Sequence, residues 1–98
     1  MNRESKRVKK IIKFSNLIIK LYRVKPDEIY LPSTATNIEA FDQNGNLLWR
    51  AGKPEYEECF WDMQIDEQMN FLEADGNAGQ KYHIDLSNGH IFKSYIVK

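Results

Sequence analysis

The stretch that organises this chain is residues 37–49, which read N-I-E-A-F-D-Q-N-G-N-L-L-W. Its Asn44-Gly45 pair predicts a β-hairpin, because a two-residue type I′ turn needs positive φ at both central residues and Asn and Gly adopt it at least cost. That turn sets the register of the two arms. The expected pairs are Gln43 with Asn46, Asp42 with Leu47, Phe41 with Leu48, Ala40 with Trp49 and Glu39 with Arg50.

The two faces of this predicted hairpin differ in character, because successive side chains of a strand point to opposite sides. The apolar face is expected to carry Ile38, Ala40, Leu47 and Trp49. The other face is expected to carry Phe41 and Leu48, with Glu39 and Arg50 as an opposite-charge cross-strand pair.

Length and composition predict one folded domain, residues 1–98, since 42% of the residues are hydrophobic and 29% are charged. The single cysteine, Cys59, cannot form an internal disulfide, which favours a reducing compartment. We expect it to act as a small buried hydrophobe. Lys13 and Lys20 interrupt the apolar stretch near the N-terminus, so we expect neither a signal peptide nor a membrane span, and a cytoplasmic location.

Charge is strongly partitioned along the chain although the net charge is zero. Residues 1–25 hold nine basic residues and one acidic residue, whereas residues 26–98 hold five basic and thirteen acidic residues. No basic residue lies between Lys53 and Lys81. Such a division indicates charged partners or pairing of the chain with itself.

The N-terminal part allows two interpretations. Residues 1–7 are expected to be a basic tail, and apolar residues of 8–24 fall at the spacing of an amphipathic helix. However, this segment is rich in β-branched residues, and Ser15-Asn16 would divide it into strands 8–14 and 17–24. We favour the two strands over the helix.

Further strands are predicted at 60–66, 69–74, 81–86 and 90–97, after a turn at 25–28, a loop to 36 and a break at 52–54. In strand 60–66, the side chains of Trp61, Met63 and Ile65 are expected to point to the core. The last hairpin turns around Ser87-Asn88-Gly89, where a three-residue loop with Gly89 as a bulge residue is a second possibility.

A weak internal repeat relates the two hairpins, since Gly45 and Gly89 lie 44 positions apart, close to the repeat length of four-stranded propeller blades. The sequence therefore predicts an all-β antiparallel meander of about eight strands. Two blade-like units would form a curved sheet, a partial barrel or a packed pair of sheets.

The chain resembles a family of small bacterial proteins with an N-I-x-A-x-D-x-x-G-N-L-L-W hairpin and a Y-x-I-D-L-x-x-G-x-I closing hairpin. The matching residues here are Asn37, Ala40, Asp42, Gly45, Leu48, Trp49, Tyr82, Asp85 and Gly89. Proteins of this kind resemble the immunity proteins of bacterial toxin systems, including contact-dependent growth inhibition. The resemblance implies that the chain neutralises a cognate toxin domain, for example a nuclease, by occluding it. The basic N-terminus departs from the family pattern.

No catalytic signature supports an enzyme. His83 and His90 lie on the last hairpin, but metal-ligand spacings, a nucleophile elbow and a phosphate-binding glycine loop are missing from the sequence. We therefore expect no metal, no cofactor and no catalysis. The carboxylates between Glu55 and Asp75 are interpreted as a solvated acidic face rather than an acid–base pair.

An acidic face with aromatic anchors could occupy the basic cleft of a nuclease toxin. The expected partner-binding residues are Glu55, Tyr56, Glu57, Glu58, Asp62, Asp66 and Glu67. Tyr56, Phe60 and Trp61 could supply the anchors. Tyr56 is the favoured anchor, Trp61 is expected in the core, and Phe60 could take either role.

Two alternatives use the basic segment instead. It could contact nucleic-acid phosphates through Lys6, Arg7, Lys9, Lys10, Lys13, Lys20, Arg23 and Lys25. It could also pair with the acidic segment of a second subunit in a homo-oligomer. The acidic remainder would repel nucleic acid, so the sequence favours a protein partner.

Overall fold

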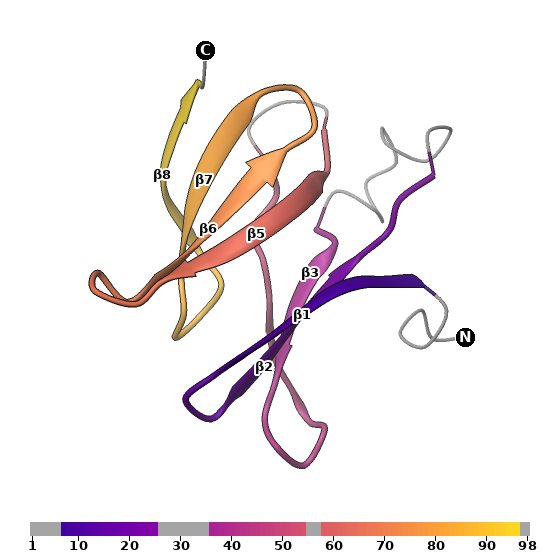
Figure 1. The fold of residues 1–98 in the computed structure, drawn as a ribbon, viewed down its shortest axis with the longest axis vertical. Coiled ribbons are helices and arrows are strands. Elements are labelled where there is room, and N and C mark those ends of the chain that lie inside the picture. Colours follow the sequence, from indigo (N-terminus) through magenta and orange to yellow (C-terminus); the bar gives the residue numbers. More distant parts are fainter. Residues whose placement is uncertain (1–6, 26–35, 55–57, 97–98) are drawn as a thin grey trace.

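The computed structural model describes residues 7–25, 36–54 and 58–96. Within these ranges, eight antiparallel strands form two four-stranded sheets that do not close into a barrel (Figure 1). The strands are β1 (Val8–Phe14), β2 (Leu17–Tyr22), β3 (Ile38–Phe41), β4 (Leu47–Arg50), β5 (Phe60–Asp66), β6 (Phe71–Gly76), β7 (Gln80–Asp85) and β8 (Ile91–Ile96). Each sheet is a meander, with strand orders β1-β2-β3-β4 and β5-β6-β7-β8. The predicted all-β class is confirmed, and each blade-like unit forms one sheet.

The N-terminal segment forms the two predicted strands, so the helical interpretation was wrong. β1 and β2 pair antiparallel and are joined by a turn in which Ser15 has φ 56°. A helix would have buried only one stripe of this segment. As strands, β1 and β2 instead bring their alternate apolar side chains onto the inner face of the first sheet.

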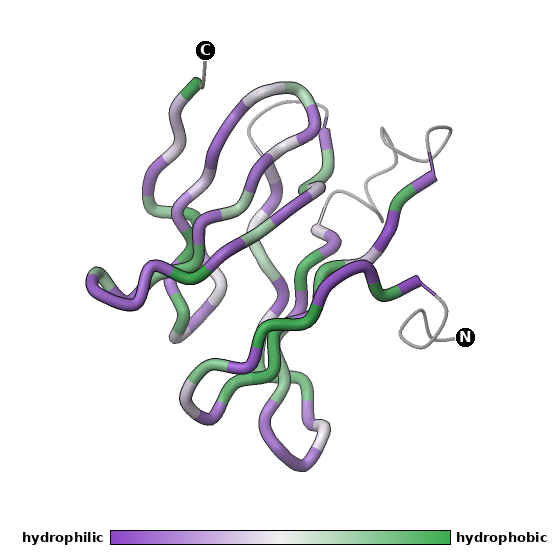
Figure 2. Tube along the Cα trace, in the orientation of Figure 1, coloured by the Kyte–Doolittle hydropathy of each residue, from purple (hydrophilic) through white to green (hydrophobic). Residues whose placement is uncertain are grey.

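The hydrophobic core lies between the two sheets. Buried residues from both sheets form one cluster, which includes Ile19, Ile38, Met63, Leu72 and Ile84. Along β6 and β7, buried and half-buried residues alternate strictly, as expected for strands with one face on the core. Figure 2 shows this alternation of hydrophobic and hydrophilic residues along the second sheet.

Asn37 links the two sheets through its buried side-chain amide. Its Nδ2 donates to the carbonyl oxygens of Tyr22 (2.8 Å) and Phe60 (2.7 Å). Its Oδ1 accepts from the backbone N–H of Phe60 (2.9 Å). Tyr22 ends β2 and Phe60 begins β5, so one amide satisfies backbone groups of both sheets where they meet.

The tip of the β3–β4 hairpin differs from the predicted type I′ turn. Asp42 donates its N–H to the carbonyl of Asn46 (2.9 Å), which leaves a three-residue loop, 43–45. Gly45 has φ 87°, whereas Asn44 is not among the residues with positive φ. The cause is the Asp42 carboxylate, whose Oδ1 accepts from the N–H groups of Asn44 and Asn46, both at 2.9 Å. These local bonds stabilise the longer loop.

The longer loop shifts the register of the hairpin by one residue near its tip. The predicted pairs of Glu39 with Arg50 and Ala40 with Trp49 are confirmed, but Phe41 pairs with Leu47 instead of Leu48. The Arg50 guanidinium contacts the Glu39 carboxylate at 2.7 Å, as predicted. Leu47 was expected on the buried face but is 49% exposed, because the register shift lies between it and Trp49.

A second shift overturns the prediction for Trp61. β5 has the predicted bounds, but Phe60 pairs with Gly76 and Asp62 with Asp75, so Trp61 is the extra residue of a β-bulge. Its side chain is 57% exposed, whereas Phe60 and Met63 are buried. The bulge adds one residue between Phe60 and Asp62, so alternation fails at Trp61, whereas Met63 and Ile65 face the core as predicted.

The remaining boundaries differ by a few residues. β6 begins at Phe71, two residues later than expected, after a turn in which Asn70 has φ 62°. The last hairpin has a four-residue loop, 86–89, closed by the bond from the Asp85 N–H to the His90 carbonyl (2.8 Å). The predicted turn and loop at 26–35 lie outside the described residues.

Candidate functional site

The four expected binding residues that the structure describes do not all lie on the surface. Glu55, Tyr56 and Glu57 lie outside the described residues. Glu58 is 1% exposed, and its carboxylate accepts hydrogen bonds from the Ala78 N–H (2.8 Å) and the Tyr82 hydroxyl. The prediction that Glu58 faces a partner was therefore wrong. The acidic residues next to Glu58 in the sequence gave no indication that its carboxylate would be buried and would accept bonds from a backbone N–H and a hydroxyl.

Asp62 lies where the two sheets meet and binds a basic residue of the same chain. Its Oδ1 lies 3.1 Å from Nζ of Lys10, which also donates to the Met63 carbonyl (2.6 Å). Partial burial raises the pKa of Asp62, but the Met63 N–H and the Lys10 ammonium outweigh it, so the pKa falls below its ordinary value. The basic and acidic segments are thus joined within one molecule at this point.

Asp66 and Glu67 lie at the turn between β5 and β6. The Asp66 carboxylate accepts from the Met69 N–H (3.0 Å), while Glu67 is exposed. Together with Gln64 and Glu73, they line a shallow hollow of about 390 Å³. These two expected site residues therefore lie on the same side of the second sheet as Glu73, which the sequence had not singled out.

Glu73 is the centre of a hydrogen-bond network on the outer face of the second sheet. All four strands contribute to it. Oε1 accepts from Gln64 Nε2 of β5 (2.6 Å) and from Lys81 Nζ of β7 (3.3 Å). Oε2 lies 3.0 Å from Nε2 of His83 on β7 and accepts from the Tyr95 hydroxyl of β8 (2.9 Å).

This network fixes the charge of Glu73. Burial raises the pKa of the carboxyl, but the hydrogen bonds from Tyr95, His83 and Lys81 outweigh this and lower it below its ordinary value. The same carboxylate raises the pKa of Tyr95. Asp75, 3.0 Å from Lys81 Nζ, raises the pKa of Lys81 together with Glu73. Near neutral pH, Glu73 is therefore an anion held in one orientation.

Aromatic rings surround the Glu73 carboxylate. The His83 ring stacks on Phe71 with centroids 4.2 Å apart, and Phe92 meets Phe71 edge-on at 5.8 Å. Tyr95 meets His83 edge-on at 5.4 Å. Phe92 is 57% exposed and Tyr95 38% exposed, so rings that pack against each other also face solvent.

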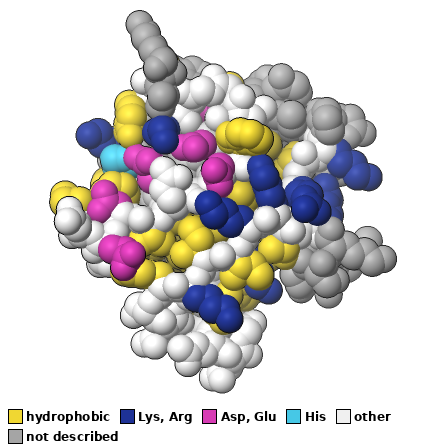
Figure 3. Space-filling model, viewed as in Figure 1, with side chains coloured by type: hydrophobic (Ala, Val, Ile, Leu, Met, Phe, Trp, Pro, Cys, Tyr) yellow, Lys and Arg dark blue, Asp and Glu magenta, His cyan; other side chains and the backbone are white. Residues whose placement is uncertain are grey.

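We call the outward side chains of the second sheet the Glu73 face. It consists of Asp62, Gln64, Asp66, Phe71, Glu73, Asp75, Lys81, His83, Asp85, Phe92, Lys93 and Tyr95. Five of these residues are carboxylates and two are lysines. Figure 3 shows the acidic side chains gathered over this sheet beside a histidine, while lysines and arginines lie mainly over the first sheet.

The sequence contained a signal for this face that was not used. In 71–75 and 81–85, every second residue is polar or aromatic, and those residues share a face in the observed register, which pairs Phe71 with Asp85 and Glu73 with His83. Which carboxylate lies at the centre depends on the register, which pairs Glu73 with His83 and with Gln64.

The expected core position of Cys59 is confirmed, since its side chain is 4% exposed. Burial raises the pKa of the Cys59 thiol. In the described ranges, no group of three or more His, Cys, Asp and Glu side chains could hold a metal ion. No helix in the same ranges has the length and apolar character needed to cross a membrane.

The fold and the Glu73 face define a small all-β protein built from two four-stranded meanders, one of which presents a carboxylate bonded to His83 and Tyr95 at the edge of a cluster of packed rings. The chain belongs to the family described as domain of unknown function (DUF7957), whose model matches residues 4–95. No curated protein and no solved structure matches the chain.

Proposed function

We propose that this chain is an immunity-type protein, which binds a cognate bacterial toxin domain through the Glu73 face and neutralises it by occlusion. The two hairpins resemble those of a family of small bacterial proteins, and proteins of that kind resemble immunity proteins. The observation that carries the proposal is the network that holds Glu73 on four strands at once, surrounded by rings that remain half-exposed.

Two physical properties of this face suit a basic protein partner, such as a nuclease domain. Its excess of carboxylates would steer a positively charged cleft toward it and raise the rate of association. Phe92 and Tyr95 offer aromatic area that becomes buried on binding, which is the usual source of slow dissociation. Because the rings and Glu73 already restrain one another, binding would order few additional side chains.

A nucleic-acid-binding role has less support. Lys10 is paired with Asp62, and Lys9 contacts Trp61, so two lysines of the basic segment are engaged inside the molecule. The Glu73 face would repel a phosphate backbone. The proposed partner is therefore a protein.

The test is capture of the toxin from the host by tagged protein, followed by binding kinetics. Phe92→Ala removes an exposed ring of the Glu73 face, and Leu48→Ala removes a side chain of similar exposure from the first sheet. We expect Phe92→Ala to raise the dissociation rate about tenfold or more and Leu48→Ala to leave it unchanged. Asp66→Lys should slow association, most strongly at low salt.

Equal capture and equal kinetics for Phe92→Ala and Leu48→Ala would contradict the proposed surface. Capture of RNA or DNA, lost in a Lys9→Gln, Lys10→Gln, Lys13→Gln variant, would replace the proposal with the nucleic-acid alternative.

A further inference from the structure

We propose that the hollow between the two sheets, beside Trp61, binds a small organic anion consisting of a carboxylate or phosphate on a compact apolar body. This site lies apart from the residues that form the Glu73 network, and it goes beyond the proposed toxin binding.

The first argument is that two β-bulges meet at this hollow. In β1, the register shifts between Val8 and Lys10, so Lys9 is the extra residue, just as Trp61 is in β5. The Lys9 ammonium lies 4.1 Å from the centroid of the Trp61 ring and donates to the Trp61 carbonyl. Bulges redirect side chains and are enriched next to functional sites. Here both redirected side chains line one hollow.

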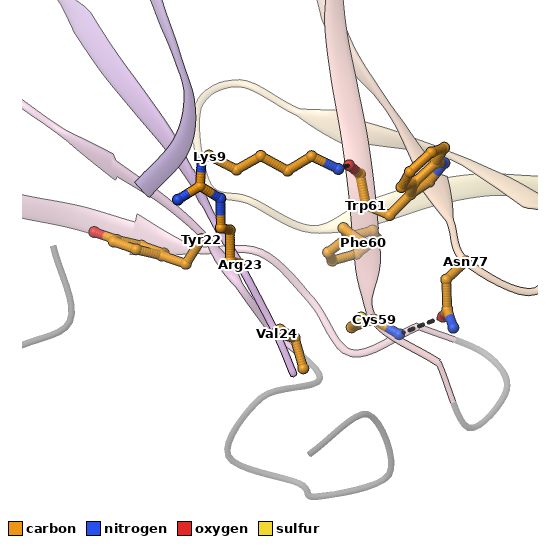
Figure 4. Close-up of a pocket in the computed structure, with 8 residues that line it drawn as sticks. All are labelled: Lys9, Tyr22, Arg23, Val24, Cys59, Phe60, Trp61 and Asn77. Carbon is orange, nitrogen blue, oxygen red and sulfur yellow. Dashed lines mark hydrogen bonds between the residues drawn. The ribbon is translucent and has the colours of Figure 1, made fainter. Parts of the chain in front are cut away.

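The second argument is the chemistry of the walls. The hollow has a volume of about 340 Å³ and lies between the end of β2 and the start of β5 (Figure 4). Lys9 and Arg23 line it on one side, and Val24, Cys59 and Phe60 provide apolar surface. Phe60 and Cys59 are buried, at 1% and 4% exposed, and the raised pKa of Cys59 keeps its thiol neutral. Apolar walls with a few charged groups are typical of ligand sites, and this volume suits a compact ligand.

The third argument is that neither of the two cations at this hollow forms an ion pair with a residue that the structure describes. The Arg23 side chain is exposed and makes no ion pair with a described residue. One N–H of the Lys9 ammonium is engaged by the neutral Trp61 carbonyl, which fixes the position of the charge without cancelling it. One positioned cation and one exposed cation beside apolar walls would favour a ligand that has an anionic head and an apolar body.

The test uses three probes that share one ring system: naphthoate, naphthyl phosphate and neutral naphthalenemethanol. Calorimetric titration of the full chain should show one saturable site for the anions, with affinity about tenfold or more above that of the alcohol. The tighter of the two anions identifies the preferred head group. In NMR spectra, the indole N–H resonance of Trp61 should shift, while that of Trp49, which is bonded to the Leu86 carbonyl, should not.

Matched variants locate the charge requirement. Arg23→Gln should weaken anion binding about fivefold or more, because it removes from the rim a cation that has no ion pair with a described residue. Lys13→Gln removes an exposed lysine from the same sheet, away from the hollow, and should change nothing. Both changes are at exposed positions, and circular dichroism should confirm that both variants fold. Equal affinity for the alcohol and the anions, or an Arg23→Gln variant that binds like the wild type, would overturn the proposal.

Discussion

Lys9 and Trp61 are each the extra residue of a β-bulge, and they contact each other where the two sheets meet. Neither residue is part of the core, yet each takes its position from the way its strand pairs inside its own sheet. The exposed Trp61 ring is therefore a consequence of backbone register. Its exposure has measurable consequences for stability and spectroscopy.

The two tryptophans should differ sharply in their contribution to stability. Trp49 is buried, and its Nε1 donates to the Leu86 carbonyl (2.8 Å), so Trp49→Ala should reduce the free energy of unfolding by about 3–5 kcal/mol. Trp61→Ala loses mainly the contact with Lys9 and should cost less than about 1 kcal/mol. Urea unfolding monitored by circular dichroism measures both values. Comparable losses for the two variants would contradict the exposed position of Trp61.

Replacing each of the two hairpin glycines, Gly45 and Gly89, by Ala should distinguish the cost of backbone strain from the cost of steric overlap. Gly45 and Gly89 have similar positive φ, 87° and 79°, so replacement by Ala carries a conformational cost of about 1 kcal/mol at each. A Cβ at Gly45 meets nothing within 4 Å, whereas one at Gly89 would lie 2.5 Å from the Trp49 ring.

Gly89→Ala should therefore reduce the free energy of unfolding by about 1–3 kcal/mol more than Gly45→Ala does. The two unfolding midpoints give this difference directly. If both variants lose the same stability, the packing of the closing loop under Trp49 is not as described.

Replacing Asn37 should weaken the connection between the sheets. Asn37→Ala leaves two carbonyls and one N–H without their buried partner, which should cost about 3 kcal/mol or more. Asn46 provides the control, since its side chain bonds only to Asp42 at an exposed loop. Asn46→Ala should cost less than about 1 kcal/mol in the same urea titration. A mild effect of Asn37→Ala would show that water replaces its bonds.

Acid should remove the stabilisation that Glu73 provides. Its folded pKa lies below the ordinary value of 4.5, so its contribution is present above pH 4.5 and is lost as the pH falls through the folded pKa. Glu73→Gln should reduce the free energy of unfolding by about 1–2 kcal/mol at neutral pH. The difference in free energy of unfolding between the variant and the wild type should narrow as the pH falls below 4.5.

Glu67→Gln is the control for this titration, because Glu67 is exposed at the β5–β6 turn. It should leave the free energy of unfolding at neutral pH close to that of the wild type, because the side chain is exposed. A gap between Glu73→Gln and wild type that stays constant as the pH falls would indicate lost packing rather than a lost charged network.

The strands could be predicted from the local sequence pattern. The wrong predictions of which side chains are buried share one physical cause. The bounds of β1 and β5 and the pairing of Glu39 with Arg50 followed from alternation and turn residues. Alternation assumes an uninterrupted ladder, and each bulge adds one residue that breaks it. The prediction for Leu47 was wrong because Leu47 lies next to the extra residue of β4, which is Leu48. The prediction for Trp61 was wrong because Trp61 is itself the extra residue of β5.

For the candidate site, the sequence predicted the kinds of residues, acidic and aromatic, but not which of them come together. The sequence places an acidic and aromatic stretch in the second half of the chain, and the structure places Asp62, Asp66 and Glu67 on or beside the Glu73 face. Glu58 was predicted to face a partner, but its burial depends on hydrogen bonds from Ala78 and Tyr82. These residues lie about 20 positions away in the sequence and contact Glu58 only in the folded chain. Glu73 lies at the centre of the network because side chains from the other three strands of its sheet, β5, β7 and β8, contact its carboxylate.

The sequence by itself determined that this chain forms antiparallel strands, where most of them begin and end, and that opposite charges lie in different halves. These properties follow from local preference and period-two burial, which need no distant partner. Only the tertiary structure decided which acids are buried, which tryptophan is exposed and where the basic and acidic segments meet. Those outcomes depend on the register of paired strands and on contacts across the two sheets, where one inserted residue interrupts the alternation of buried and exposed side chains.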